Sequence, residues 1–270
     1  MSFSITAIIP TMLNDSGLFY LVQKLISEKI PIIIIDNQPN SKKHKLAKNK
    51  QITYLPQTKN LGFAAAVNLG VKAATTDWLL ILNDDIELSK SSLHEWPSGL
   101  SWSENFKQLL AALISYAQIN KLVAVSPVLA NKQDKVENYG YRVLPYGKVE
   151  LNFNPKISLS GNETKSLSWS GKFAKGSIDG LTAACLLIRR DIFLKVHGFD
   201  KRFFAYLEDV DLFLTLNEQD YKFTVYPKLA VIHNHQTTST NMKKGFKEWH
   251  DFKNWILLST KHPRYFKFKI

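Results

Sequence analysis

The sequence predicts an α/β protein with a doubly wound, mixed but mostly parallel sheet flanked by helices. Two apolar runs of strand length, Ile30–Ile35 and Trp78–Leu82, lack the polar alternation of a half-exposed strand. This is expected of strands that are buried on both faces of a parallel sheet. Stretches with helical spacing separate the strands, and such alternation implies right-handed parallel crossovers. With 45% apolar and 21% charged residues, the 270-residue chain has enough apolar material for a continuous core.

Strands and helices alternate along the first third of the chain. Pro10 closes the first strand, and Ser16 is a suitable N-cap for the helix that follows. The expected elements are a strand over Ser4–Ile9, a helix over Gly17–Glu28, strands over Ile30–Ile35 and Gln51–Leu55, a helix over Phe63–Ala74 and a strand over Trp78–Leu82. Ligands of doubly wound sheets bind outside the carboxyl ends of the strands. The residues that follow these strands are therefore the first candidates for a binding site.

The rest of the chain continues this pattern less regularly. We expect a helix over Ser101–Ile119, a strand over Leu122–Leu129, a turn-rich hairpin region over Val136–Val149, a loop over Asn152–Lys175, a strand over Leu181–Ile188, helices over Asp191–Val196 and Asp209–Gln219, and a strand over Phe223–Ile232. Neither a repeat nor a linker-like segment divides these elements. The sequence therefore predicts one domain over residues 1–240 and a C-terminal extension over residues 241–270.

The C-terminal extension is basic and aromatic. The chain has a formal net charge of +12, and residues 241–270 hold eight Lys or Arg against two acidic residues, a surplus of six positive charges. Phe246, Trp249, Phe252 and Ile256 recur there at helical spacing. Such a segment fits an anionic membrane surface, or a helix that packs on the domain through its aromatic stripe. Nucleic acid fits less well, and we expect no nucleic-acid partner.

Cysteine content and hydropathy argue against a disulfide-stabilised protein and against a membrane-spanning one. Cys185 is the only cysteine and lies in an apolar run, so an internal disulfide is excluded and a reducing compartment is expected. The first ten residues lack the basic start and apolar core of a signal peptide. No apolar run approaches the roughly 20 residues that span a bilayer. We therefore expect a cytoplasmic protein that does not cross a membrane.

An acidic turn follows the last strand of the first third. Asn83, Asp84 and Asp85 come directly after Leu82. Carboxylates at the carboxyl end of a strand can hold a hard divalent cation, which in turn neutralises phosphates. A plain acidic turn or a helix cap is the alternative interpretation.

Two other polar segments also end strands. Asp36 and Asn37 could hydrogen-bond ribose hydroxyls or a base edge, although both residue types also favour ordinary turns. Asn60 and Gly62, with Asn68 in the following helix, lie where a strand passes into a helix. A glycine there can let backbone N–H groups approach an anion at the positive end of the helix. A glycine that simply starts the helix is the alternative.

A second acidic group opens the helix expected over Asp209–Gln219. Glu208 and Asp209 follow the aromatic run Phe203–Tyr206. A carboxylate among other acids and aromatic rings can have a raised pKa and act as a general base, although acidic residues also favour helix N-termini. His233 and His235 follow the last strand, and either could complete a metal site or serve as a hydrogen-bonded structural residue.

Taken in order, these segments resemble the family-two glycosyltransferases of the GT-A fold, especially their bacterial rhamnosyltransferase-like branch. The matching words are Ile8-Ile9-Pro10-Thr11, Ile35-Asp36-Asn37, Asn60-Leu61-Gly62-Phe63 with Asn68 and Gly70, Leu82-Asn83-Asp84-Asp85-Ile86-Glu87-Leu88, Gly198-Phe199-Asp200, Arg202-Phe203-Phe204, Glu208-Asp209-Val210-Asp211-Leu212, and His233 with Ser239. They cover most of residues 4–240. Each word is weak alone, and the resemblance depends on their order and spacing together.

The resemblance implies a role for each matching residue. Asp209 would be the catalytic base, with Glu208 as the alternate. Asp85 would be the metal-binding acid of a DxD motif whose first position is Asn83, and His233 would be a late ligand of the metal or the diphosphate. The residues that would bind the nucleotide sugar are Pro10, Thr11, Asp36, Asn37, Asn60, Gly62, Asn68, Asn83 and Asp84. Residues 1–88 would form the nucleotide-binding half and residues 89–240 the acceptor and catalytic half.

These roles imply an inverting, metal-dependent glycosyltransferase that uses Mg²⁺ or Mn²⁺. It would transfer a sugar, with rhamnose as one candidate, from a nucleotide-diphosphate donor to a lipid-linked or glycan acceptor in bacterial cell-surface polysaccharide synthesis. The enzyme would be cytoplasmic, with its C-terminal extension resting on the inner face of the membrane. The chain departs from the family pattern at Thr182-Ala183-Ala184, Lys201 and Thr215, which leaves the identities of the donor and acceptor open.

Two other classes of protein remain as alternatives. A sugar nucleotidyltransferase would normally carry a glycine-rich basic loop near its first strand, and Pro10–Gly17 contains no such loop. A non-catalytic sugar-nucleotide-binding relative would not need the intact Asp85, Asp209 and His233.

Overall fold

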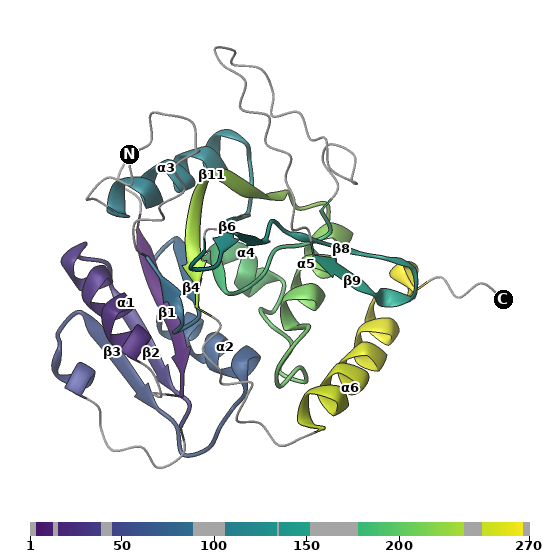
Figure 1. Cartoon of the computed structure of the whole chain (residues 1–270), viewed down its shortest axis with the longest axis horizontal. Helices are drawn as coiled ribbons and strands as arrows, with labels where there is room; N and C mark the ends of the chain where they lie inside the picture. The colour runs from purple at the N-terminus through teal and green to yellow at the C-terminus, as the bar shows by residue number, and fades with distance from the viewer. Residues whose placement is uncertain are drawn as a thin grey trace.

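A nine-stranded sheet with helices on both faces forms the centre of the protein, and a two-stranded sheet lies beside it (Figure 1). The computed structural model describes residues 4–12, 16–38, 45–88, 106–133, 135–151, 178–234 and 245–266. The strands are β1 (Ile5–Thr11), β2 (Ile32–Asp36), β3 (Ile52–Pro56), β4 (Trp78–Leu82), β5 (Ile86–Glu87), β6 (Ala124–Ala130), β7 (Val136–Asn138), β8 (Tyr141–Val143), β9 (Val149–Leu151), β10 (Cys185–Arg189) and β11 (Phe223–His233). The helices are α1 (Ser16–Ser27), α2 (Phe63–Ala73), α3 (Phe106–Ile119), α4 (Arg190–Lys195), α5 (Glu208–Glu218) and α6 (Phe246–Lys261), with short 3-10 turns η1 (Lys45–Lys48), η2 (Pro145–Gly147) and η3 (Pro263–Tyr265).

Six strands of the large sheet run in the same direction. The strand order is β3-β2-β1-β4-β10-β6-β11-β5, with β7 paired to β6. Parallel pairs join β1 to β2 and β4, β2 to β3, and β6 to β11. Strands β10, β5 and β7 are antiparallel to their neighbours. The predicted mixed, mostly parallel sheet is confirmed, and the antiparallel β10 joins its two parallel parts.

Each face of the sheet buries its own apolar core. In β2, Ile32 and Ile34 pack in the core that includes α1 and α3, whereas Ile33 and Ile35 pack in the core that includes α2, α4 and α5. All five residues of β2 and all five of β4 are buried. Burial on both faces explains why these strands lack polar alternation in the sequence.

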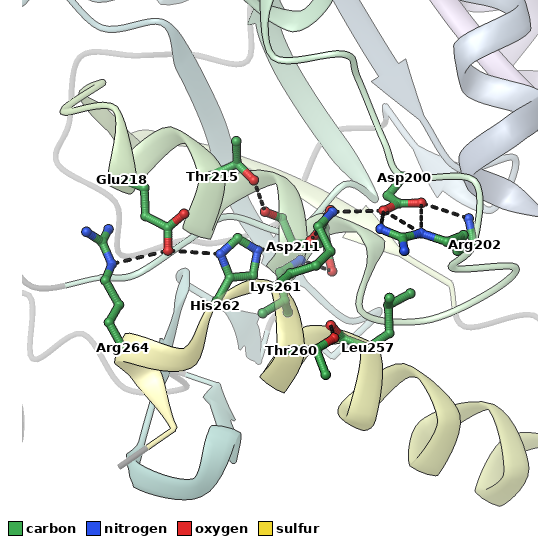
Figure 2. Close-up of polar contacts among 12 residues, drawn as sticks. Asp200, Arg202, Asp211, Thr215, Glu218, Leu257, Thr260, Lys261, His262 and Arg264 are labelled. Carbon is green, nitrogen blue, oxygen red and sulfur yellow. Dashed lines mark hydrogen bonds and ion pairs between the residues drawn. The ribbon is translucent and has the colours of Figure 1, made fainter.

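The helix of the C-terminal extension, α6, packs against α5 through buried charges (Figure 2). His262, only 2% exposed, places Nε2 3.0 Å from Asp211 Oδ1 and Nδ1 3.0 Å from Glu218 Oε1. Because both partners are carboxylates, both ring nitrogens donate and the imidazole is positively charged. Lys261 Nζ lies 2.7 Å from Asp211 and 2.8 Å from Asp200. The end of α6 is therefore fixed to α5 by paired charges.

The same contacts set the pKa of the buried groups. Burial alone would lower the pKa of His262, but its hydrogen bonds to Asp211 and Glu218 raise it above the usual value. Burial would raise the pKa of Asp200, and hydrogen bonds from Arg202 and Lys261 instead hold it well below the usual range. The network is thus stable in its charged form.

We expect His262→Gln to lower the free energy of unfolding by about 2 kcal/mol at pH 6, since it removes hydrogen bonds between charged groups. The folded-state pKa of His262 lies above that of the unfolded chain. Its stabilisation is therefore complete below about pH 6.5 and is lost as the pH rises through the folded-state pKa. Urea titrations between pH 5 and 9 should show the difference from wild type shrinking toward high pH. His197→Asn, at an exposed turn, is the matched control, and a pH-independent difference for His262→Gln would contradict this account.

Most of the elements expected from the sequence are present, with ends that move by a few residues. The predicted hairpin region holds the β8–β9 pair, and β7 pairs with β6 instead. The strand expected from Leu181 begins at Cys185. The loop predicted over Asn152–Lys175 and His235 lie outside the described residues. No helix in the described ranges is long and apolar enough to cross a membrane.

Candidate active site

The carboxyl ends of β1, β2 and β4 meet at one edge of the sheet, as predicted. Thr11 ends β1 and is in register with Asp36, which ends β2. Thr11 Oγ1 donates a hydrogen bond of 2.5 Å to Asp84 Oδ2, so the end of β1 is tied to the acidic turn after β4. Pro10 is buried within β1, one residue before this contact. Asn83 N–H bonds to Ala184 O over 2.9 Å and so continues the β4–β10 pairing into the turn.

Asp36 is completely buried, and its carboxylate already has two donors. Tyr54 Oη donates to Oδ2 over 2.5 Å, and the Gln38 N–H donates to Oδ1 over 3.1 Å. Asp36 therefore holds Tyr54 and the start of the following loop in place at the edge of the sheet.

Asn37 and Asn60 together shape the loop before α2. Asn37 Oδ1 accepts the Leu61 N–H over 2.9 Å, and Asn37 Nδ2 donates to Asn60 Oδ1 over 3.0 Å. Asn60 Oδ1 also accepts the Gly62 N–H over 2.8 Å. These bonds use the side chains of two predicted nucleotide-binding residues to support the backbone of the loop before α2.

Gly62 and Asn68 contact the chain segment that leads to α5. Gly62 has φ 78°, and a Cβ there would lie 2.3 Å from Phe204 O, which accepts the Phe63 N–H over 2.9 Å. Asn68 bonds both backbone groups of Phe199, accepting from its N–H over 3.0 Å and donating to its carbonyl over 2.6 Å. The N–H groups of residues 61–63 are thus all satisfied within the chain. In this conformation their hydrogen bonds point within the chain, and the close packing of Phe204 O accounts for a glycine at this position.

Asp85 and His233 face each other at the same edge. β5 pairs with the end of β11, which places His233 opposite Ile86, and Asp85 O accepts the Asn234 N–H over 3.0 Å. His233 Nε2 lies 3.2 Å from Asp85 Oδ1, and both side chains are nearly buried. That Asp85 oxygen is buried and makes no well-formed hydrogen bond to the part of the chain that the structure describes. A carboxylate oxygen and an imidazole nitrogen that face each other in this way suit a shared cation.

The residues present fit a divalent ion that a substrate helps to bind. Within the described ranges, no three His, Cys, Asp or Glu side chains converge as a complete metal cage. Mg²⁺ in nucleotide sites is usually bound by one or two carboxylates together with substrate phosphates. A two-ligand site formed by Asp85 and His233 matches that pattern, and a self-contained structural metal site does not.

Glu208 and Asp209 form the first turn of α5. Burial raises the pKa of Glu208, and the nearby charge of Asp209 raises it further. Burial also raises the pKa of Asp209, although N–H groups of Ala183 (3.3 Å) and Val210 (2.8 Å) donate to its carboxylate and favour its charged form. Among the described residues, Glu208 Oε2 is buried and has no hydrogen-bond partner. Asp209 is therefore the better placed of the two to be the ionised base.

A cleft of about 500 Å³ brings the acidic pair together with His233. Its other lining residues include Tyr206 of the aromatic run. They also include Tyr141 from β8, Leu207 before α5 and Asp251 from α6, which the sequence patterns did not indicate. Tyr141 Oη also contacts Asp209 O at 3.2 Å. The candidate nucleotide residues Thr11, Asp36 and Asp84 lie at the sheet edge and do not line this cleft, whereas Asn68 lines a different one. The Asp85–His233 pair joins the two regions.

Comparison with known proteins gives a family match for the part of the chain that forms the sheet edge. Residues 6–95 match the family described as Glycosyl transferase family 2. Over this third of the chain, the protein is similar to that family. The matched range runs from β1 past the acidic turn, so it holds Thr11, Asp36 and Asp85, whereas Asp209 and His233 lie beyond it.

Two known proteins are similar to this chain over a longer range. An N-acetylglucosaminyl-diphospho-decaprenol L-rhamnosyltransferase of Mycobacterium tuberculosis is 23% identical over 229 residues, which are 80% of this chain and 69% of the relative. Rhamnosyltransferase WbbL of Escherichia coli K12 is 25% identical over 66% of this chain and 60% of its own length.

Solved structures show the GT-A type of fold. GalNAc-T7 with UDP, GalNAc and Mn²⁺ superposes with a TM-score of 0.68 at 13% identity, over 96% of this chain and 48% of that chain. The chain thus spans about half of that protein and about two thirds of the mycobacterial relative. The fold class predicted from the sequence is confirmed.

Proposed function

We propose that this protein is a glycosyltransferase that moves a sugar from a nucleotide-diphosphate donor to an acceptor hydroxyl, with inversion at the anomeric carbon. One observation supports this most directly. His233 faces Asp85 of the acidic turn and also lines the cleft that holds Glu208 and Asp209. An inverting displacement needs a group that stabilises the leaving anion and, across the reacting carbon, a base for the acceptor. The two adjoining parts of the site can supply one of each.

Asp209 is the proposed base, with Glu208 as the alternate. The Asp209 carboxylate takes the proton of the acceptor hydroxyl as that oxygen forms a bond to the anomeric carbon and the bond to the diphosphate breaks. No covalent intermediate is needed. Burial raises the pKa of Asp209, which makes it a stronger base than an exposed carboxylate.

Asp85 and His233 are the proposed ligands of Mg²⁺ or Mn²⁺. Bound there, the ion would offset the negative charge that develops on the departing nucleoside diphosphate. The nucleotide would lie along the edge formed by Pro10, Thr11, Asp36, Asn37 and the Asn83–Asp84 turn, supported by the Asn60–Gly62 loop. Residues 1–88 thus form the nucleotide-binding half and residues 89–240 the acceptor and catalytic half.

The relatives indicate which substrates to test first. The names of both relatives describe rhamnosyl transfer, and that of the mycobacterial one includes a lipid-linked sugar diphosphate. We therefore propose a rhamnosyl or other hexosyl donor and a lipid-linked or glycan acceptor of bacterial cell-surface polysaccharide synthesis. The departures at Thr182 to Ala184, Lys201 and Thr215 lie in the half that would bind the acceptor.

A panel of nucleotide sugars, each with Mg²⁺ or Mn²⁺ and a lipid-linked sugar acceptor, tests this function. The expected product with one donor is a nucleoside diphosphate together with an extended acceptor. Release of pyrophosphate from a sugar phosphate and a nucleoside triphosphate would instead identify a nucleotidyltransferase. Binding of nucleotide sugars without turnover of any donor would indicate a non-catalytic relative.

We further propose that α6 rests on an anionic membrane at the inner face. Trp249, Phe252 and Ile256 are 62%, 58% and 43% exposed, and their spacing places them on one face of the helix. Asn254 and Leu258 of the same helix are fully buried against the domain. The extension carries a surplus of six positive charges, which complements anionic lipid. Asp251 of α6 lines the cleft, so this surface adjoins the proposed acceptor site.

Liposome co-sedimentation tests the membrane surface. Replacing Trp249, Phe252 and Ile256 by serine should weaken binding to anionic liposomes at least tenfold, because each buried apolar side chain contributes about 1.5 to 3 kcal/mol. The matched control replaces Phe19 and Tyr20, exposed residues of α1. This control should bind anionic liposomes as the wild type does, and that binding should weaken as the salt concentration rises. Equal binding by both variants would refute the proposal. Loss of self-association in the triple variant would instead show that this face is an interface between copies.

A further inference from the structure

Two consecutive residues before the acidic pair adopt a conformation that is unfavourable for side chains. Tyr206 has φ 68° and Leu207 has φ 65°, and neither is glycine. The left-handed region brings Cβ close to the following carbonyl oxygen, so such pairs persist only where surrounding contacts hold them. Leu207 is the residue that precedes α5, and Glu208 and Asp209 follow it directly. The direction in which the acidic pair points therefore depends on this strained turn.

Asn254 of α6 binds the backbone of this turn. Its Nδ2 donates hydrogen bonds to Ala205 O and to Tyr206 O, both 2.7 Å long. The residue is completely buried, so water does not compete for these carbonyls. Its Oδ1 has no hydrogen-bond partner within the described residues. The hydrogen bonds of the Asn254 side chain are thus made by its amide nitrogen. They join Asn254 to residues that lie 48 and 49 positions earlier in the chain.

α6 is itself fixed to the helix that carries the acidic pair. Lys261 and His262, at its C-terminal end, form the charged contacts with Asp211 described above (Figure 2). The ring of His250 also stacks on Phe204, just before the turn, with 5.5 Å between ring centroids. Asn254 lies between these two contacts along the helix. It is therefore held at a set position relative to α5.

We propose that Asn254 is a positioning residue for the transfer reaction, because its side-chain amide holds the Ala205–Leu207 turn in the conformation that directs Glu208 and Asp209 into the cleft. The effect on rate rests on the proposed function, whereas the effect on the turn does not. Displacing a catalytic base by about 1 Å can lower the reaction rate about 100-fold. A residue that only supported the fold would instead lower stability and donor binding together with turnover.

Asn254→Leu removes both donors while keeping a branched side chain of similar outline, and Asn254→Ala is a second, smaller variant. We expect both to lower kcat at least tenfold, while the KM of the donor stays within about twofold and circular dichroism remains that of the wild type. The matched control is Lys253→Met, which removes the 3.0 Å bond from the neighbouring α6 residue to Arg202 O, upstream of the turn. This control should keep kcat within about twofold of the wild-type value.

Hydrogen exchange separates this proposal from the proposed function. In either Asn254 variant, the amides of residues 203–211 should exchange at least tenfold faster than in wild type, and those of α6 should be unchanged. If the wild-type protein transfers no sugar, the function fails and exchange alone decides the role of Asn254. An unchanged exchange rate, a kcat within twofold of wild type, or variants that unfold or lose donor binding would each overturn the positioning role.

Discussion

Replacing Asp209 by asparagine should lower kcat at least 100-fold and leave the KM of the donor within about twofold. A general base typically contributes about 10² to 10⁴ in rate, and an amide cannot take the acceptor proton. The asparagine oxygen can still accept an N–H bond such as that from Val210, so α5 should keep its first turn. Steady-state release of the nucleoside diphosphate at saturating acceptor measures the effect.

Two variants serve as controls for this result. Asp220→Asn lies after the other end of α5, at a left-handed position that asparagine tolerates, and should retain wild-type turnover. Glu208→Gln tests the alternate base and should lower kcat much less than Asp209→Asn does. If the asparagine variant kept more than about a tenth of wild-type kcat, Asp209 would not be the base, and a larger loss in Glu208→Gln would assign that role to Glu208.

The pH dependence of turnover gives the same prediction another test. Burial raises the pKa of Asp209, and the base must be ionised to act. Turnover should therefore fall as the pH is lowered through this raised pKa, at a pH above the ordinary carboxyl range of about 4. The other ionisable side chains that line the same cleft are Glu137, Tyr141, Tyr206, Glu208, His233 and Asp251. A fall in turnover that begins only at the ordinary carboxyl range would argue against a buried base.

Asp85→Ala should weaken the metal-assisted binding of a nucleoside diphosphate at least tenfold. The change removes one of the two facing atoms that we propose as metal ligands. Such a site would bind a hard cation together with the substrate phosphates. Calorimetry with and without Mn²⁺ measures the effect, and the metal-free affinities of the two proteins should agree. His233→Ala should act in the same direction.

The matched control for this loss is an acidic residue at the opposite end of the same strand. Asp77 lies just before β4, where it contacts Ser4, and Asp77→Asn should bind the diphosphate with metal as the wild type does. If Asp85→Ala and wild type bound equally well in the presence of Mn²⁺, Asp85 would not be a metal ligand.

Sequence patterns predicted the strands and helices of residues 1–88 well because their signals are local. β2 is apolar up to its last residue, Asp36, and β4 is apolar throughout and is followed by the acidic turn that contains Asp85. The rule that strand ends share an edge then placed those residues together. The same patterns did not indicate the contact that requires a glycine at position 62, since it comes from Phe204, far along the chain.

What the sequence by itself determined is the fold class, the edge that holds the candidate nucleotide residues, and the acidic pair as candidate base. These follow from the periodicity of hydrophobic residues and from the chemistry of residues that are neighbours in sequence, and both can be read directly from the sequence. Only the tertiary structure decided that His233 faces Asp85, and that Asn254 of α6 holds the turn before Glu208. Such contacts join residues 48 to 148 positions apart, and long-range packing leaves no periodic mark on either partner. A buried asparagine in a helix therefore looks like any other polar helical residue until the chain has folded.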